Sequence, residues 1–318
     1  MALRTRFTER FGLEHPLMSA PMALHSGGTL AAAVSAAGGM GSFGGTHFLQ
    51  PPAWVTAQAE LVRERTDRPF AIGFITPFLP MTEPYLDAAL EARPAAIALS
   101  FSDPGRWAPR VREAGCALIC QVQTFADAEL ALEAGADVLV AQGTEAGGHT
   151  GELSLLPLLT GIAEAHPEVI LLAAGGVGSG RGLAAALLAG ADGAWLGTAF
   201  LATPEAVEID DGHKQAIVDS DGTDTVFTRA YDIAMGGPWP PGIGLRVRRD
   251  EFTDTWAERE AELRSVRDTV HVDGIGVLYG ESARFVPAVD PAADVLRRIS
   301  AEAEQILRDR PRSVLSAG

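Results

Sequence analysis

The feature that most constrains the fold of this chain is a repeated alternation of short apolar runs with longer alanine-rich segments. Runs that are apolar throughout are typical of strands buried on both faces of a parallel sheet. Eight such runs, each followed by a segment of helical character, favour a closed (β/α)8 barrel over an open doubly wound sheet. The expected strands are Leu17–Pro21, Met40–Phe43, Phe70–Ile75, Ala95–Ser100, Ala117–Val122, Asp137–Ala141, Val169–Ala173 and Gly193–Leu196.

The segments between these runs predict helices that end at glycine. Glycine makes up 35 of the 318 residues, well above the usual share of about 7%. Much of it closes helices, as in the turns Glu133–Asp137 and Leu188–Asp192, where a left-handed residue is needed. The expected helices are Gly28–Ala37, Pro51–Arg65, Glu83–Arg93, Pro104–Ala114, Phe125–Ala134, Leu153–His166 and Arg181–Ala189.

The character of the chain changes after Thr203, where charge, tryptophan and proline become more frequent. We therefore expect three parts: a barrel over residues 1–203, a small helical lid over 204–288, and a C-terminal part over 289–318 that returns to the barrel. The last part contains an amphipathic helix over Ala292–Leu307 and a frayed tail from residue 311.

The charge balance excludes several classes of function. The net charge of −16 opposes binding to nucleic acid, because the one short arginine cluster, 246–249, is followed at once by acidic residues. All basic residues except Lys214 are arginine. Lys214 lies in a polar run, so Schiff-base chemistry, which needs a lysine amine, is not expected.

The sequence also predicts a cytoplasmic protein. The N-terminal residues 1–14 carry acidic side chains and no apolar core, unlike a signal peptide. The most apolar stretch, 171–200, is interrupted by glycines, Arg181 and Asp192, so no membrane span is expected. Cys116 and Cys120 are read as free, buried thiols rather than a disulfide framework.

Two glycine-rich loops predict a phosphate site. Gly175 and Gly176 follow the seventh strand, and Gly197 and Thr198 follow the eighth. In barrels a phosphate commonly binds these two loops, since glycine lets backbone amides approach the anion and a threonine hydroxyl adds a donor. Taken alone, either glycine pair would be read as a tight turn that needs a left-handed backbone.

The loop after the sixth strand carries the candidate catalytic residue. His149 follows Gly147 and Gly148, so its ring can project over the barrel mouth, where barrel active sites lie. An imidazole suits a general base near neutral pH, although a lone loop histidine often only bonds to backbone. No histidine pair has metal-ligand spacing with a carboxylate, so no metal site is expected.

Several phrases together resemble the nitronate monooxygenase family, formerly called 2-nitropropane dioxygenases. The Glu-Ala-Gly-Gly-His phrase is the most specific, and it is shared with FMN-dependent enoyl-[acyl-carrier-protein] reductases and NADH:quinone reductases. The phrases span nearly all of 1–203 in order, with two more beyond: Ala20-Pro21-Met22, Ala36 to Gly41, Gln142 to His149, Ala173 to Val177, Leu196 to Phe200, Val226 to Ala230 and Tyr279 to Glu281.

The resemblance implies a barrel that holds non-covalent FMN, with His149 as catalytic base. It places the FMN phosphate against Gly176, Gly197 and Thr198. It also assigns to the cofactor site, around the flavin ring and in the adjoining loops, Ala20, Met22, Gly73, Gln142, Gly147, Gly148 and Gly175. Two positions depart from the family pattern. Ala71-Ile72-Gly73 stands where the family often has Gly-Val-Asn, and Trp195 stands where many members have Gln. They leave the phosphate loops intact and bear on the substrate more than on the cofactor.

Three functions follow from this reading. The leading hypothesis is FMN-dependent oxidation of alkyl nitronates, or nitroalkanes, by O2 to a carbonyl compound and nitrite, with a small organic molecule as substrate. The alternative is an FMN-dependent NAD(P)H reductase of a quinone or an enoyl-[acyl-carrier-protein], with the region of Trp239 and Arg246 as a nucleotide wall. A third is an isomerase or binding protein for a phosphorylated metabolite. A homodimer is left open.

Overall fold

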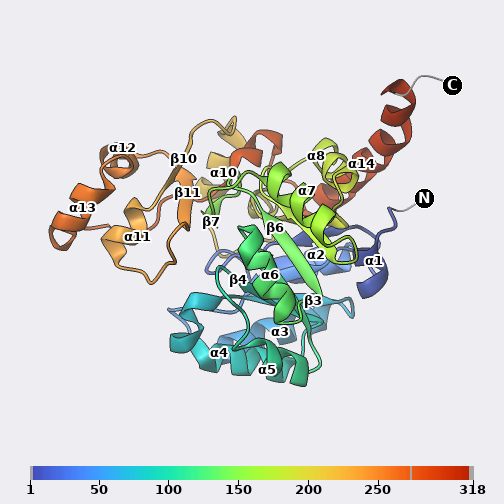
Figure 1. The fold of residues 1–318 in the computed structure, drawn as a ribbon, viewed down its shortest axis with the longest axis horizontal. Coiled ribbons are helices and arrows are strands. Elements are labelled where there is room, and N and C mark those ends of the chain that lie inside the picture. Colours follow the sequence, from blue (N-terminus) through green and yellow to red (C-terminus); the bar gives the residue numbers. More distant parts are fainter. Residues whose placement is uncertain (1–2, 273, 315–318) are drawn as a thin grey trace.

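Eight parallel strands form a nearly closed barrel in the computed structural model, which describes residues 3–272 and 274–314 (Figure 1). The hydrogen-bonded order is β1-β9-β8-β6-β5-β4-β3-β2, and the bridge from Met18 to Met40 brings β2 back beside β1. The expected (β/α)8 barrel is confirmed. Its strands are β1 (Leu17–Ser19), β2 (Gly41–Gly44), β3 (Phe70–Ile75), β4 (Ala96–Ser100), β5 (Ala117–Val122), β6 (Val138–Gln142), β8 (Ile170–Ala174) and β9 (Gly193–Leu196).

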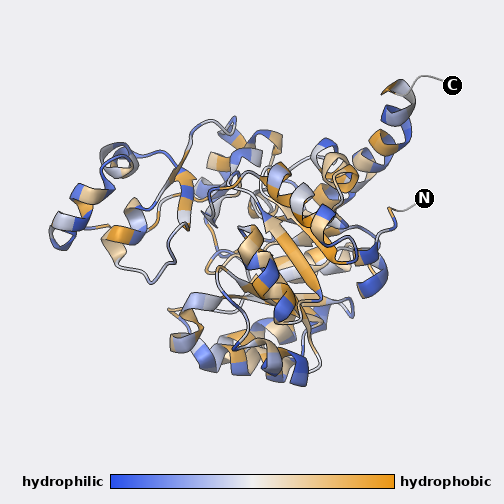
Figure 2. Cartoon of the chain, viewed as in Figure 1, coloured by the Kyte–Doolittle hydropathy of each residue, from blue (hydrophilic) through white to orange (hydrophobic). Residues whose placement is uncertain are grey.

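Alternate residues of these strands point to two different cores. Figure 2 shows the apolar residues gathered on the strands, with hydrophilic residues along the outer helices. One set, including Ile119, Val140 and Leu172, fills the barrel interior with mostly small residues. The other set, including Ile72 and Leu139, packs outward against the helices. Burial of each large apolar side chain contributes about 1.5–3 kcal/mol, so the two layers dominate the stability of the barrel.

A ring of helices covers the outside of the barrel. The C-terminal helix α14 packs against α8 and α2 and so completes the ring. A Cβ on Gly180 would lie 2.4 Å from that of Glu302, so glycine allows α8 and α14 to cross closely. The ring consists of α2 (Gly28–Ala36), α3 (Ala53–Arg65), α4 (Leu79–Ala92), α5 (Ala108–Glu113), α6 (Phe125–Glu133), α7 (Leu155–Ala165), α8 (Gly180–Leu188) and α14 (Ala292–Val314).

Two helices extend well beyond their predicted bounds. Helix α4 begins at Leu79, directly after the short helix η1 (Thr76–Phe78), and not at residue 83. A kink at Thr82 makes this possible, because it accommodates Pro84, which has no amide to donate. Helix α14 continues through 311–314, where a frayed tail was predicted, and 315–318 lie outside the described residues.

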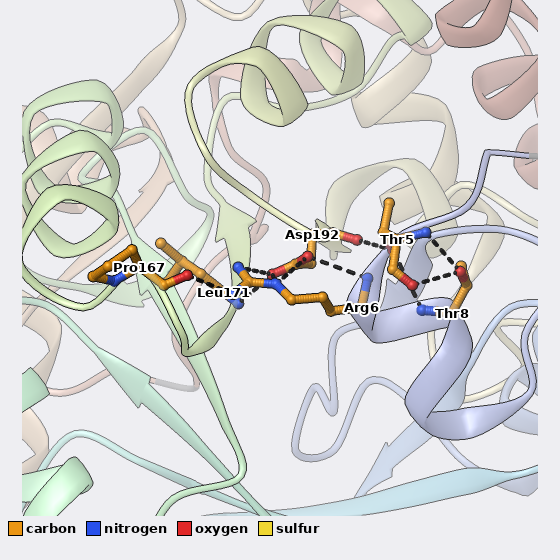
Figure 3. A network of polar contacts seen from close by, with 6 residues as sticks. All are labelled: Thr5, Arg6, Thr8, Pro167, Leu171 and Asp192. Atoms are coloured by element: carbon orange, nitrogen blue, oxygen red, sulfur yellow. Dashed lines mark hydrogen bonds and ion pairs between the residues drawn. The ribbon is translucent and has the colours of Figure 1, made fainter.

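A polar network closes the amino-terminal end of the barrel (Figure 3). Helix α1 (Arg6–Phe11) is capped by Thr5 and inserts Phe7 beneath the barrel core. The Arg6 guanidinium donates to both oxygens of Asp192 at 2.7–3.1 Å, and the amide of Leu171 donates to the same carboxylate at 3.1 Å. This end is therefore sealed by α1, and any binding site must lie at the opposite end of the strands.

The region between β9 and α14 is more than a helical lid. It contains two strands, β10 (Thr225–Thr228) and β11 (Gly244–Arg248), which form an antiparallel sheet with β7 (Gly148–Thr150) from the loop after β6. Leu245 of β11 pairs with His149 of β7. The remaining elements are α9 (Thr198–Leu201), α10 (Asp211–Asp219), α11 (Ala230–Met235), α12 (Glu251–Trp256), α13 (Glu260–Val266), η2 (Arg267–Thr269) and η3 (Glu281–Phe285).

Candidate active site

A cavity of about 520 Å³ opens at the carboxyl ends of the barrel strands. Its walls come from the loops after β1, β3, β4, β6, β8 and β9, and from the segments around 232–239 and 274–282. The lining is mostly apolar with a few polar groups, which is usual for sites that take small organic molecules. Among the described residues, no lysine or arginine lines it.

The structure brings nearly all of the predicted site residues to this one cavity. Gly176 is the exception: it is half-buried between two lining residues, Gly175 and Val177. The barrel-interior residue Trp195 also reaches the cavity, so this departure from the family pattern lies inside the site. The predicted residues that line the cavity are Ala20, Met22, Gly73, Gln142, Gly147, Gly148, His149, Gly175, Gly197 and Thr198.

Glycine is required where the backbone walls of the cavity meet. A Cβ on Gly147 would lie 2.3 Å from the carbonyl carbon of Tyr279, and one on Gly73 would lie 2.2 Å from Cγ of Pro21. Gly175 and Gly176 have φ values of +93° and +68°, in the left-handed region that side chains disfavour. Glycine at these positions therefore lets the loops that border the cavity pack closely against one another.

The phosphate loops present unused donors. Within the described part of the chain, neither the amide of Gly176 nor that of Gly197 donates to a protein acceptor. The Thr198 hydroxyl accepts from the amide of Gly280 at 2.9 Å, which leaves its own proton free to donate. The first amide of α8, that of Gly180, is already taken by the Glu302 carboxylate at 2.9 Å. An anion here would be held by the loop amides and Thr198 rather than by the end of α8.

The basic residues Arg181, Lys214 and Arg246 do not line the cavity. Arg181 is exposed, and Lys214 is buried although it lies in a polar run. The buried Arg246 donates to the carbonyl of Thr144 at 2.7 Å and lies 3.3 Å from Glu281, so it ties the β6–β7 loop to the lid. Arg246 is thus a structural anchor of the lid.

A chain of two glutamines fixes the backbone of the catalytic candidate. Gln123 donates to Oε1 of Gln142 at 2.8 Å, and Gln142 in turn donates to the carbonyl of His149 at 3.0 Å. Both glutamines are buried. Since buried amides need partners, this chain orients Gln142 as well as the strand that carries His149.

The ring of His149 is held on two sides. Its Nε2 lies 2.9 Å from Oδ1 of Asp232, a residue of α11. The indole of Trp239 stacks on it with centroids 3.4 Å apart and planes inclined by 14°. Phe101 meets both rings edge-on, at 6.4 Å from His149 and 5.4 Å from Trp239. The imidazole therefore has one fixed orientation at the cavity wall.

Two lining residues have a backbone conformation that is costly for their type. Leu24 and Phe101 have φ values of +66° and +75°, which cost a non-glycine residue about 1–2 kcal/mol each. Strain of this kind persists where the surroundings impose it and is concentrated at functional sites. In Phe101 it directs the ring at the end of β4 against Trp239.

Sequence reasoning missed several residues of the site. Asp232 gave no local signal, because its partner is His149, 83 positions earlier. Phe78, Phe101 and His25 also line the cavity. Each follows a predicted strand, but nothing in the spacing singled out any of the three. His213 is half-buried against His25 with ring centroids 5.7 Å apart. Burial lowers the pKa of His25 below its ordinary value.

Across 3–272 and 274–314 no group of three or more histidine, cysteine or carboxylate side chains is arranged to hold a metal ion. In the same residues no helix is both long and apolar enough to cross a membrane. Cys116 and Cys120 are both free and buried.

Fold and comparisons together define a (β/α)8 barrel enzyme. Its cavity is bordered by His149 and by two loops, with Gly175 and Gly176 in one and Gly197 and Thr198 in the other, which we call the glycine cradle. The nitronate monooxygenase family profile matches residues 82–235. A nitronate monooxygenase of Neurospora crassa is 32% identical, over 92% of this chain and 90% of its own length. This chain belongs to the nitronate monooxygenase family, and it is a flavin oxidoreductase.

Solved structures extend the comparison. FabK from Thermotoga maritima superposes with a TM-score of 0.86 at 28% identity, covering 98% of this chain and all of that one. Nitroalkane oxidase from Streptomyces ansochromogenes superposes with a TM-score of 0.78 at 27% identity, covering 96% of this chain and 99% of that one. Both similarities span the barrel and the lid.

Proposed function

We propose that the protein binds FMN in the cavity and uses O2 to oxidise alkyl nitronates to carbonyl compounds and nitrite. The observation that carries the proposal is that His149 and the glycine cradle line one apolar cavity in a member of this family. When bound, FMN supplies the electron acceptor for the nitronate.

The residues present fit FMN. The unused amides of Gly176 and Gly197 and the Thr198 hydroxyl would hold the phosphate, so backbone dipoles rather than cationic side chains would meet its charge. The flat ring would lie near Gly73 and Gly147, which both line the cavity. Binding of the phosphate by backbone amides is consistent with two observations. The amides of Gly176 and Gly197 have no protein acceptor, and among the described residues no lysine or arginine lines the cavity.

The chain's own residues would bind and prepare the substrate. The apolar rings of Phe78, Phe101 and Trp239 would exclude water around the organic group. His149 would take the α-proton when the substrate is a neutral nitroalkane. In its protonated form the same ring would hold the anionic nitronate at the cavity wall.

Oxygen consumption with a preformed nitronate and no nicotinamide tests the proposal. We expect a yellow protein that consumes oxygen and releases nitrite, and a His149→Gln variant that loses nitroalkane turnover by roughly 10²-fold or more. His166→Gln is the matched control, since His166 pairs with Glu129 at the surface, remote from the cavity. A flavin-loaded wild type that consumes no oxygen with nitronates would refute the proposal.

A second candidate function is an FMN-dependent NAD(P)H reductase of a quinone or an enoyl thioester. The similarity to FabK, an enoyl reductase, over the whole chain favours it. An anaerobic titration with NADH or NADPH separates the two functions. Rapid bleaching of the flavin would support the reductase, and a flavin that stays oxidised would support the nitronate oxidation.

A further inference from the structure

Asp232 is a buried carboxylate with a single partner. It is 7% exposed and lines the cavity, and its Oδ1 lies 2.9 Å from Nε2 of His149. The other oxygen, Oδ2, is buried without any hydrogen-bond partner in the described structure. A carboxylate that accepts so few bonds in a buried site is costly to keep for stability alone. We therefore look for a functional role of Asp232 in its contact with His149.

The contact with Asp232 favours a proton on Nε2 of His149. An ionised carboxylate only accepts hydrogen bonds, so the Nε2 of a neutral imidazole bonded to it is the donor. The second nitrogen, Nδ1, then carries the lone pair, and it makes no hydrogen bond with any described residue. The stack on Trp239 fixes the plane of the ring, and the bond from Gln142 to the His149 carbonyl fixes the backbone that carries it.

We propose that Asp232 is a positioning residue that locks His149 in the Nε2–H tautomer and makes Nδ1 the base. The inference rests on the proposed function and specifies how its proton step works. The α C–H bond of the nitroalkane breaks, its electron pair moves to the nitro group, and the proton forms a bond with Nδ1. The products are a nitronate anion and an imidazolium, whose positive charge lies next to the buried Asp232 carboxylate.

This arrangement also explains where Asp232 lies in the chain. It is on α11, next to the β10–β11 pair whose second strand is paired with β7, so one unit of the lid holds both the backbone and the ring of His149. The amides of Gly236 and Gly237 both donate to the backbone carbonyl of Asp232, which closes the end of α11 beside Trp239. The lid thus positions the base as well as covering the cavity.

The tautomer is measurable without any turnover. In the protein labelled with ¹⁵N-histidine, the two ring nitrogens of His149 are distinguished by their shifts at alkaline pH, where histidine is neutral. His149→Gln assigns the signals. We expect a proton on Nε2 in the wild type, and a mixture of both tautomers in Asp232→Asn, whose amide can also donate to Nε2. A wild type with the proton on Nδ1 would overturn the inference even if Asp232→Asn does not fold.

Kinetics with two forms of one substrate supply the second test. In Asp232→Asn we expect kcat for neutral nitroethane to fall roughly 10²-fold or more, and kcat for ethyl nitronate to change by less than about threefold. Asp254→Asn is the matched control, because Asp254 is an exposed carboxylate of the lid that pairs loosely with Arg249. Equal losses on both substrates, or no loss on either, would contradict a positioning role.

The two proposals fail in different ways. A wild type that oxidises no nitronate refutes the proposed function and leaves the tautomer measurement standing as a test of Asp232. A wild type that oxidises nitronates, with a tautomer unchanged in Asp232→Asn and an unchanged ratio of the two kcat values, refutes only the role of Asp232.

Discussion

Substitution of Gly147 by alanine tests whether the cavity depends on direct contact between two backbone segments. A Cβ at this position would lie 2.3 Å from the carbonyl carbon of Tyr279 and 2.4 Å from the amide nitrogen of Gly280. Non-bonded heavy atoms are comfortable at about 3.5–4.0 Å, so the segments must separate by about 1 Å. Neither neighbour is a side chain that can rotate away.

The cost of Gly147→Ala follows from the bonds that this separation would stretch. The amide of Glu281 donates to the carbonyl of Glu145 at 3.1 Å, and that of Gly280 donates to Thr198 at 2.9 Å. Overpacking costs about 1–3 kcal/mol, and a weakened buried hydrogen bond adds about 1 kcal/mol. We expect a loss of about 2–4 kcal/mol, or a fall in Tm of roughly 3–6 °C for a chain of this length.

Calorimetry of the flavin-free protein measures the loss, and a fluorescence titration with FMN measures its effect on the cradle. We expect FMN to bind at least about tenfold more weakly, since both displaced segments line the cavity. The control is Gly182→Ala in α8, where the new Cβ would have only ordinary contacts, the nearest at 3.5 Å. Helix propensity should there raise stability by about 0.5–1 kcal/mol. If Gly147→Ala unfolds within about 1 °C of the wild type, the reasoning is wrong.

Three further predictions concern buried groups. Arg246→Met leaves the Thr144 carbonyl without its donor and should cost about 2–4 kcal/mol; a denaturation midpoint equal to that of the wild type would contradict this. Burial raises the pKa of the Cys120 thiol to about 12 and also raises that of Cys116. Neither should therefore react with a thiol reagent near neutral pH until the protein unfolds, and fast labelling of the native protein would argue against the packing described. Burial lowers the pKa of His25 from 6.5, so the unfolded chain takes up a proton first as the pH falls. The free energy of unfolding should therefore decline as the pH falls below about 6.5, which the midpoints of urea denaturation measure. An equal decline in the His25→Gln variant would show that another group is responsible.

The barrel could be predicted from the sequence because its signals are local. The strands β5 and β9 have the predicted bounds, because both are buried along their whole length and their sequences are mostly apolar. The position of the cradle glycines at the barrel mouth could be predicted for a similar reason. Each follows a predicted strand, and the strand order of a barrel brings the ends of all strands to one mouth.

The lid could not be predicted in the same way because its structure depends on distant partners. Strand β7 has three residues, too few for a periodic pattern, and it exists because β11, about 95 positions later, pairs with it. Asp232 resembles any acidic residue in the first turn of a helix. Only the folded structure shows that it meets His149 and that Trp239 covers the imidazole ring.

The position of α14 has a consequence for the order of events during synthesis. The last strand of the barrel, β9, ends at residue 196, yet the helix that fills the gap between α8 and α2 begins only at residue 292. The intervening segment, which carries Asp232 and Trp239, therefore leaves the ribosome before the outer layer can close. Because β1 must also wait for β9, contacts far apart in the sequence should limit the rate of folding. A chain released a few turns early would expose the apolar sides of α2 and α8 and become a target for aggregation.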